Sequence, residues 1–315
     1  MKRIKERIKH FVHVIRASGT ANPLYYNCTN RKLRKLIKIF VTPAGLIRWF
    51  IRAGTKERTG IAAVLIAKNE APYIKEWLDF HIKQGINHFF IYDNDSNDNF
   101  REVLKPYIDS GIVTYQLLPG RGRLLDAYNM AAATHGKEYK YFAVIDADEF
   151  LFVRKSIENR NLFDFVDEFM TSHKNAGGLA VHWLIFGSAG HIKKPEGGVL
   201  ENYTKCAERN YVGNHVIKTI CDPMKVLGYI TPYFPVYVRG YDNLDENGEH
   251  VHANQADNVC FEKIRINHYT VKARDEFIRV KMSRGDAGSL NSIPMDVFVM
   301  NDRNEETDTE ILSVR

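Results

Sequence analysis

The sequence predicts an α/β protein with a doubly wound, mostly parallel sheet, preceded by a basic helical N-terminal extension. Two observations lead to this fold class. From residue 60 onward, short apolar runs alternate with amphipathic segments of helical length, as in right-handed βαβ units. Hydrophobic residues make up 44% of the chain and charged residues 26%, which is typical of a globular protein with one large core or two modest ones.

The first 59 residues carry the basic character of the chain. They contain 15 Lys and Arg and two Glu, a net charge of +13, whereas the whole chain is +6 and residues 60–315 therefore sum to −7. Apolar residues recur on one helical face and basic residues on the others, which predicts amphipathic helices over 1–59. Such helices suit an anionic membrane surface, and packing against the rest of the protein is the alternative.

The longest apolar stretch of this segment, residues 39–51, contains Pro43 and Arg48 and is shorter than the roughly 20 residues that span a bilayer. We therefore expect a cytoplasmic protein that is peripheral on the inner face of the cell membrane if the basic segment binds there. Nucleic acid is not an expected partner, because the main body is acidic and aromatic residues are sparse among the basic ones. Four widely spaced cysteines without a CxxC pair argue against a zinc site and against a disulfide scaffold.

Residues 60–300 are predicted to form one domain that begins with four strand–helix units. Its strands are expected at 61–69, 88–94, 112–118 and 141–150, with helices between them at 71–85, 99–107 and 124–136. A further strand is expected to end in the glycine-rich turn of "GLAVHWLIFGSAGH", and "NLDENGEH" (243–250) is typical of a hairpin turn. The acidic tail, residues 301–315, is expected to be loosely ordered.

Three carboxylates follow the fourth apolar run, at Asp146, Asp148 and Glu149. Removing carboxylates from water is costly unless a cation or hydrogen-bond donors meet them. In an extended segment Asp146 and Asp148 point to the same side, because side chains alternate with period two. Two carboxylates that share a ligand are relieved best by a hard divalent cation such as Mg²⁺ or Mn²⁺. The pattern therefore favours a metal site over a structural carboxylate cluster.

Polar residues also follow the first three predicted strands. Since the carboxyl ends of parallel strands meet at one crevice, these side chains are expected to line a single ligand site. They are Asn69 and Glu70, Asp93 and Asn94, and Arg121 and Arg123. The two arginines lie in "PGRGR" before a helix, an arrangement that suits an anion, with a solvated loop as the alternative. For the residues after the first two strands, turn formation and helix capping are the alternatives.

The chain resembles glycosyltransferases of the nucleotide-sugar-dependent A fold, and more narrowly glycosyltransferase family 92 and the family-2-like group. The resemblance covers about residues 60–285 and rests on an ordered set of stretches: "AKNEAPYIKEWLDFH" (67–81), "GINHFFIYDNDSNDN" (85–99), "IDADEFLF" (145–152), "HWLIFGSAGH" (182–191), "VIKTI" (216–220) and "INHYTVKARDEF" (266–277). It implies metal-dependent transfer of a sugar, with inversion, from a nucleotide diphosphate donor to a glycan or lipid-linked acceptor. We expect the donor to be a UDP-sugar.

The resemblance implies roles for single residues as well. It makes His268 a third ligand of Mn²⁺ or Mg²⁺ beside Asp146 and Asp148, whereas a histidine after an apolar strand is otherwise more often a core residue. It makes Lys218 a counter-charge for the diphosphate, with a surface lysine on an edge strand as the alternative. Asp93 is the expected contact of the nucleobase, because its carboxylate can accept a hydrogen bond from a pyrimidine N–H.

The acceptor side is expected to use His182, which can hydrogen-bond a hydroxyl, and Trp183, which can stack on a sugar face or lie in the core. Inversion needs a carboxylate that activates the acceptor hydroxyl. Asp286 is preferred for this base, and Glu149 is the second candidate.

Two other functions remain open. A sugar nucleotidyltransferase would need its glycine-rich loop after the first strand, whereas "PGRGR" follows the third. A non-catalytic adaptor that keeps the fold would tolerate loss of the D-x-D pattern, whereas both aspartates and His268 are present.

Overall fold

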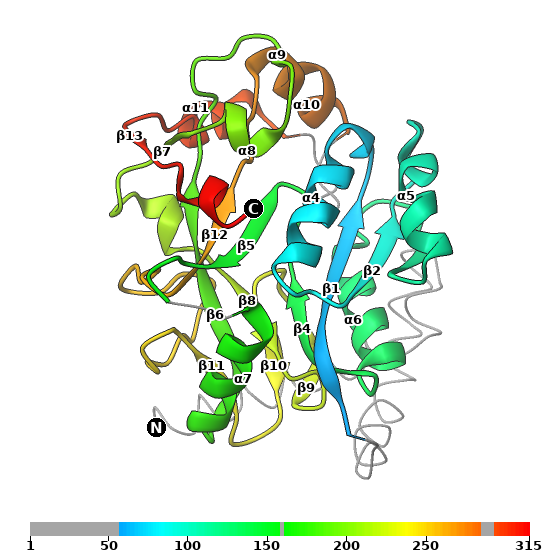
Figure 1. Ribbon diagram of the computed structural model, residues 1–315, viewed down its shortest axis with the longest axis vertical. Helices are drawn as coiled ribbons and strands as arrows, with labels where there is room; N and C mark the ends of the chain where they lie inside the picture. Colours follow the sequence, from blue (N-terminus) through cyan, green and yellow to red (C-terminus); the bar gives the residue numbers. More distant parts are fainter. Residues whose placement is uncertain (1–56, 158–160, 285–292) are drawn as a thin grey trace.

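The computed structural model describes residues 57–157, 161–284 and 293–315. In these ranges, nine strands form one sheet with the order β3-β2-β1-β4-β8-β6-β12-β5, and β11 adds to β6 beside this path (Figure 1). β1 to β4 are parallel to one another, whereas β8 is antiparallel to both of its neighbours. The mostly parallel sheet expected from the sequence is confirmed.

The first half follows the predicted order. Its elements are β1 (Thr59–Ala67), α4 (Ala71–Lys83), β2 (His88–Asp93), α5 (Phe100–Asp109), β3 (Val113–Leu117), α6 (Leu124–His135) and β4 (Tyr139–Val144). The single strand expected at 141–150 is instead two strands, because β4 ends at Val144 and β5 (Glu149–Val153) pairs antiparallel with β12 (Ile264–His268).

The second half of the chain consists of helices and strands that are mostly short. They are α7 (Leu162–Ser172), β6 (Ala176–Ile185), α8 (Val199–Asn202), β7 (Lys205–Cys206), η1 (Val212–His215), β8 (Ile217–Cys221), β9 (Val226–Tyr229), β10 (Pro235–Tyr237) and β11 (Asp242–Leu244). After β12 come α9 (Arg274–Glu276), the π-helical turn η2 (Phe277–Lys281), α10 (Met282–Arg284), α11 (Met295–Asn301), β13 (Glu306–Thr307) and η3 (Glu310–Ser313).

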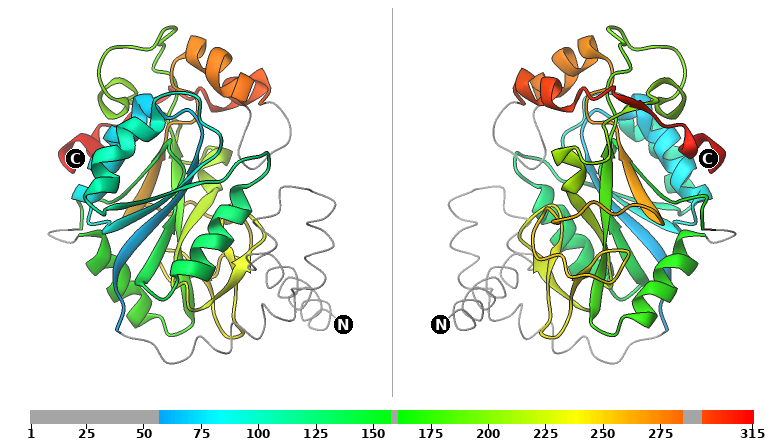
Figure 2. Two further views of the ribbon diagram at one scale, coloured as in Figure 1. Left: turned by 90° about the vertical axis from the view of Figure 1, so that its right-hand side faces the viewer. Right: turned by 90° about the vertical axis from the view of Figure 1, so that its left-hand side faces the viewer.

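Helices cover both faces of the sheet, as a doubly wound fold requires (Figure 2). Ile61, Ala63 and Leu65 of β1 belong to the core that α4, α5 and α7 complete. Ala62, Val64 and Ile66 alternate with them and belong to the core formed with α6 and the β9–β10 pair. Period-two alternation along a strand that is buried on both faces therefore supplies two cores at once.

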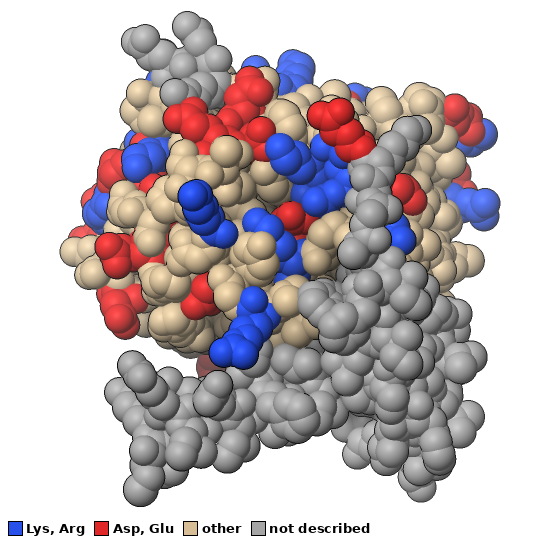
Figure 3. Space-filling view, turned by 90° about the horizontal axis from the view of Figure 1, so that it is seen from below, with Lys and Arg blue, Asp and Glu red and all other residues tan. Residues whose placement is uncertain are grey.

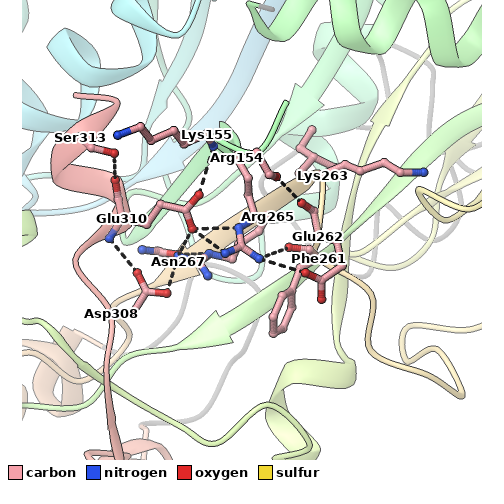
Figure 4. Close-up of polar contacts among 12 residues, drawn as sticks. Arg154, Lys155, Phe261, Glu262, Lys263, Arg265, Asn267, Asp308, Glu310 and Ser313 are labelled. Carbon is pink, nitrogen blue, oxygen red and sulfur yellow. Dashed lines mark hydrogen bonds and ion pairs between the residues drawn. The ribbon is translucent and has the colours of Figure 1, made fainter. Parts of the chain in front are cut away.

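The acidic tail packs onto the body, which differs from the loose order expected for it. β13 pairs with β7, and Ile311 of η3 is buried. Figure 4 shows the polar contacts of this region: Asp308 lies 2.8 Å from the guanidinium of Arg265, and Glu310 accepts a 2.8 Å hydrogen bond from Arg154. Arg265 is only 1% exposed, so its charge needs a partner, and the tail provides it.

Residues 1–56 of the basic N-terminal extension lie outside the described residues. On the described part of the face in Figure 3, acidic and basic side chains are interspersed. No helix within the described ranges is both long and apolar enough to cross a membrane.

Candidate active site

The candidate site lies where the parallel strands β4, β6 and β12 end, toward the top of Figure 1. A tight turn joins β4 to β5 there, in which the Glu149 amide donates to the Asp146 carbonyl oxygen at 3.1 Å. Trp77 of α4 fixes this turn, because its indole nitrogen donates to the carbonyl oxygens of Asp146 at 3.0 Å and Glu149 at 2.8 Å. The buried aromatic residue of α4 thus positions the carboxylates that follow β4.

Lys218 of β8 is the counter-charge of two of these carboxylates. Its ammonium donates to Asp146 Oδ2 at 2.8 Å and lies 3.6 Å from Glu149 Oε2. Glu149 Oε2 also accepts from the Asp146 amide at 2.9 Å, and the Tyr128 hydroxyl donates to Asp146 Oδ1 at 3.3 Å. Lys218 is 1% exposed on a central strand, so it is not the surface lysine of an edge strand.

Burial and charge oppose each other in this cluster. Burial favours the neutral form of Lys218, but Asp146 and Glu149 hold its pKa well above the ordinary value. Burial raises the pKa of Glu149 well above its usual range, with Lys218 opposing that rise and Asp146 adding to it. The single ammonium is therefore shared by two carboxylates that repel each other.

Asp148 faces a different set of partners. Lys281 of η2 donates to Asp148 Oδ2 at 2.5 Å, and Nε2 of His268 at the end of β12 lies 3.5 Å from Oδ1. Lys281 also donates to the carbonyl and hydroxyl oxygens of Thr270. Burial alone would raise the pKa of Asp148, but Lys281, His268 and Lys272 hold it well below its usual range. The carboxylate is therefore an anion with a cation already beside it.

Among the described residues Asp146 and Asp148 contact different side chains, whereas an extended segment would direct both carboxylates to one side. The physical reason is the turn, since residues 145–148 are not part of a strand and period-two alternation does not apply. Among the described residues, the only three potential ligand atoms that lie within 4.8 Å of one another belong to Asp242, His250 and His252, far from this turn in the sequence.

The residues at Asp148 nevertheless fit a divalent cation. A carboxylate and an imidazole nitrogen, both able to ligate Mn²⁺, converge there, and the Lys281 ammonium supplies positive charge at the same carboxylate. In the described structure His268 Nδ1 is buried without a hydrogen-bond partner. Lys281 was not expected from the sequence, because a lysine 133 positions away carries no local signal of this contact.

Trp183 and His182 occupy opposite faces of β6, as adjacent strand residues must. The Trp183 ring lies 4.2 Å from the His268 ring, and its indole nitrogen has no hydrogen-bond partner within the described ranges. His182 is fully buried, with Nδ1 3.6 Å from Cys260 Sγ, and burial lowers its pKa to about 4. Trp183 therefore borders the candidate metal ligands, whereas His182 lies in the interior.

The predicted nucleotide-binding residues after β1 and β2 lie together and form the turns there. Asn69 has a left-handed backbone (φ 56°), and its side chain accepts from the Asn97 amide at 2.8 Å. Asp93 accepts from the Ser96 amide at 2.9 Å and the Tyr115 hydroxyl at 2.6 Å. Asn94 donates to the carbonyl oxygens of residues 118 and 120, and Glu70 is the buried N-cap residue of α4.

The "PGRGR" loop presents its two arginines differently. Arg121 is exposed, whereas Arg123 is the N-cap residue of α6, 3% exposed, with Nε 3.2 Å from Asp126 Oδ2. The loop thus offers one accessible guanidinium beside a helix N-terminus. Asp286 lies outside the described residues.

Two solved structures show partial similarity to the chain. S. aureus TarS in complex with UDP is 17% identical, with a TM-score of 0.33 over 52% of this chain and 47% of that chain. The mannosyltransferase PcManGT from Pyrobaculum calidifontis in complex with GDP-Man and Mn²⁺ is 16% identical, with a TM-score of 0.29 over 43% and 40%.

Similarity in sequence identifies the family. A glycosyltransferase family 92 protein of Oryza sativa subsp. japonica is 30% identical over 138 residues, and one of Ricinus communis is 28% identical over 138 residues. Each alignment covers 44% of this chain but only 23% and 24% of those longer proteins. The model of glycosyltransferase family 92 matches residues 62–282, more than two thirds of the chain. The chain belongs to glycosyltransferase family 92.

Proposed function

We propose that this protein is a metal-dependent glycosyltransferase that moves a sugar, with inversion, from a UDP-sugar to a glycan or lipid-linked acceptor. The observation that carries the proposal is the pair of Asp148 and His268 at the carboxyl ends of β4 and β12, where the cation of Lys281 already meets the carboxylate. Ligands of doubly wound sheets bind at this edge.

In this proposal Asp148 and His268 would hold Mn²⁺ or Mg²⁺, and Asp146 would be the further carboxylate ligand of the ion. When bound, the ion would neutralise the charge that develops on the diphosphate leaving group. Lys218 holds the Asp146 side chain in place, since its ammonium donates a hydrogen bond to that carboxylate at 2.8 Å. Lys281 must leave Asp148 for the ion to bind there, and Thr270 can retain its ammonium nearby.

The donor is proposed to lie along the first strand ends. Asp93 would accept from the base, with Asn69 and Glu70 beside it. Asn94 would support the loop that carries Arg121 and Arg123, because it binds the carbonyl oxygen of Gly120 at 2.7 Å. The exposed Arg121 is the one of the two that can reach a phosphate.

On the acceptor side, Trp183 would stack on a sugar ring, and its indole N–H, which has no partner among the described residues, is suited to a hydroxyl. The contact of His182 with an acceptor hydroxyl that the sequence predicts is left out of this proposal, because its side chain is fully buried on the opposite face of β6. Asp286 remains the proposed base, in preference to Glu149, whose carboxylate is fully buried and already accepts from the Asp146 amide.

Calorimetric titration tests the proposed donor and its metal dependence. We expect UDP to bind at least about tenfold more tightly than GDP or CMP, a difference of roughly 1.4 kcal/mol, and to lose affinity when Mn²⁺ is withdrawn. Tightest binding by GDP or CMP would count against Asp93 as the residue that reads the base. Metal-independent binding of UDP would count against the role of Asp148.

We further propose that residues 1–59 dock the enzyme on an anionic membrane surface, beside the catalytic domain of residues 60–300. Each basic residue near such a surface contributes on the order of 1 kcal/mol, so even a fraction of the 15 suffices for reversible binding. Full-length protein should sediment with anionic vesicles at low salt, be released as salt rises, and ignore neutral vesicles. Deleting residues 1–55 should abolish sedimentation. A truncated protein that misfolds or still sediments would instead indicate a packed structural segment.

A further inference from the structure

A second group of potential metal ligands lies at the opposite end of the sheet from the candidate active site. Asp242 of β11 pairs with Ala176 at the start of β6, whereas Trp183 lies seven residues further along that strand. At about 3.3 Å per residue, this separates the two regions by roughly 23 Å. A ligand near Asp242 would therefore not contact the candidate active site.

Two histidines converge on one oxygen of Asp242. Nδ1 of His250 lies 3.0 Å from Asp242 Oδ2, and Nδ1 of His252 lies 3.2 Å from the same atom. The two imidazole rings stack with centroids 5.4 Å apart and an angle of 17° between their planes. Two ligands of a tetrahedral zinc ion, each about 2.0–2.1 Å from the metal, lie about 3.3 Å apart, close to the observed separations.

The backbone conformation of residues 242–252 brings these three side chains close to one another. "NLDENGEH" forms the hairpin turn predicted for it, because Leu244 and His250 make an antiparallel bridge. Val251 is buried, whereas His250 and His252 on either side of it are exposed, and both imidazoles reach the same oxygen of Asp242.

The carboxylate is held as well. Asp242 Oδ1 accepts from the Asn243 amide at 2.8 Å, and the Asp242 amide donates to the Asn175 carbonyl oxygen at 3.0 Å. Oδ2 is left to face the imidazoles. The side-chain amide of Asn175 lies 3.4 Å from His250 Nε2, where a metal-bound imidazole would need a partner for its second nitrogen.

We propose that Asp242, His250 and His252 bind one Zn²⁺, which clamps residues 250–252 to β11. Two imidazole nitrogens and one carboxylate are a zinc ligand set, whereas Mg²⁺ and Ca²⁺ prefer oxygen ligands throughout. The side chains are between about a third and three quarters exposed, which lets water complete the coordination. The cysteine spacing that argues against a zinc site does not bear on this one, because it uses no thiolate.

Competition of tag-free, metal-free, full-length protein with a chromophoric zinc chelator tests the proposal. The Asp148→Asn background excludes zinc binding at the candidate active site. On that background we expect one equivalent of Zn²⁺ to bind, and the further changes His250→Gln and His252→Gln to weaken this binding at least tenfold. The matched control is His135→Gln, which alters a histidine paired with Glu138 at 2.9 Å on α6 and should leave zinc binding unchanged.

Thermal unfolding gives a second readout that does not depend on the chelator. Zinc should raise the melting temperature of the Asp148→Asn and His135→Gln proteins, but not that of the protein lacking both His250 and His252. The proposal is overturned if the histidine variants bind the same equivalent of zinc, or if the unaltered cluster binds none at about 10 µM free Zn²⁺. Equal affinity for Mn²⁺ would also overturn it.

Discussion

Replacing Asp148 with Asn is expected to reduce sugar transfer by about two to three orders of magnitude, the usual effect of removing one strong electrostatic stabiliser. The amide keeps the size of the carboxylate but cannot carry the charge that a divalent cation needs. The fold should survive, because Lys281 keeps its hydrogen bonds to both oxygens of Thr270 after the change. Initial rates with a UDP-sugar and saturating Mn²⁺ measure the effect.

Asp222→Asn is the matched control for this variant. Asp222 directly follows β8, which runs antiparallel to β4, so it lies at the opposite end of the sheet from Asp148. Its carboxylate also forms a partly buried ion pair, at 2.9 Å from Arg58. The control should keep a near-normal transfer rate. The metal mechanism is wrong if Asp148→Asn transfers sugar at the wild-type rate with Mn²⁺ chelated.

Replacing Lys218 with Met is expected to reduce the free energy of unfolding by about 3–5 kcal/mol, as for other buried ion pairs that lose one partner. The change leaves Asp146 and the fully buried Glu149 facing each other without their cation. Urea unfolding at pH 7 measures it. Lys105→Met is the control, because Lys105 forms an exposed helical pair with Asp109 that contributes at most about 0.5 kcal/mol.

The loss in Lys218→Met should depend on pH with a definite sign. Burial and the Asp146 charge raise the pKa of Glu149 in the folded protein. Without Lys218, the larger of the two effects that oppose this rise is lost, and only the hydrogen bond from the Asp146 amide remains. A group with a raised folded pKa stabilises the fold below its unfolded value, about 4.3, and this contribution is lost as pH rises. The destabilisation should therefore be smaller at pH 5 than at pH 8. Adding Glu149→Gln should restore much of the stability that Lys218→Met removes. A loss that is identical at both pH values would show that Lys218 acts through packing alone.

The βαβ half of the fold is predictable because its signals are local. The runs from β1 to α6 alternate between buried strands and amphipathic helices, and their ends differ from the predicted ones by about two residues. The break between β4 and β5 leaves no such signal, because apolar residues resume at Phe150 as they would in a continuing strand. Its cause is the pairing of β5 with β12, more than a hundred residues later in the chain.

The charged contacts show the same limit. Local pattern identified the carboxylates Asp146 and Asp148, but the cations that meet them, Lys218 and Lys281, come from distant elements. The resemblance to family 92 supplied Lys218, whereas nothing in the sequence indicated Lys281. The acidic composition after Asn301 predicted loose order, because the need of the buried Arg265 for a carboxylate becomes visible only once β12 is placed in the sheet.

A crystal structure with UDP and Mn²⁺, with anomalous data at the manganese edge, tests the central claim most directly. The proposed function predicts one anomalous peak about 2.0–2.5 Å from both the Asp148 carboxylate and a ring nitrogen of His268, in contact with the diphosphate oxygens, and with Lys281 displaced from Asp148. A complex in which UDP is bound, Lys281 still contacts Asp148, and the manganese peak is absent or lies elsewhere would contradict it.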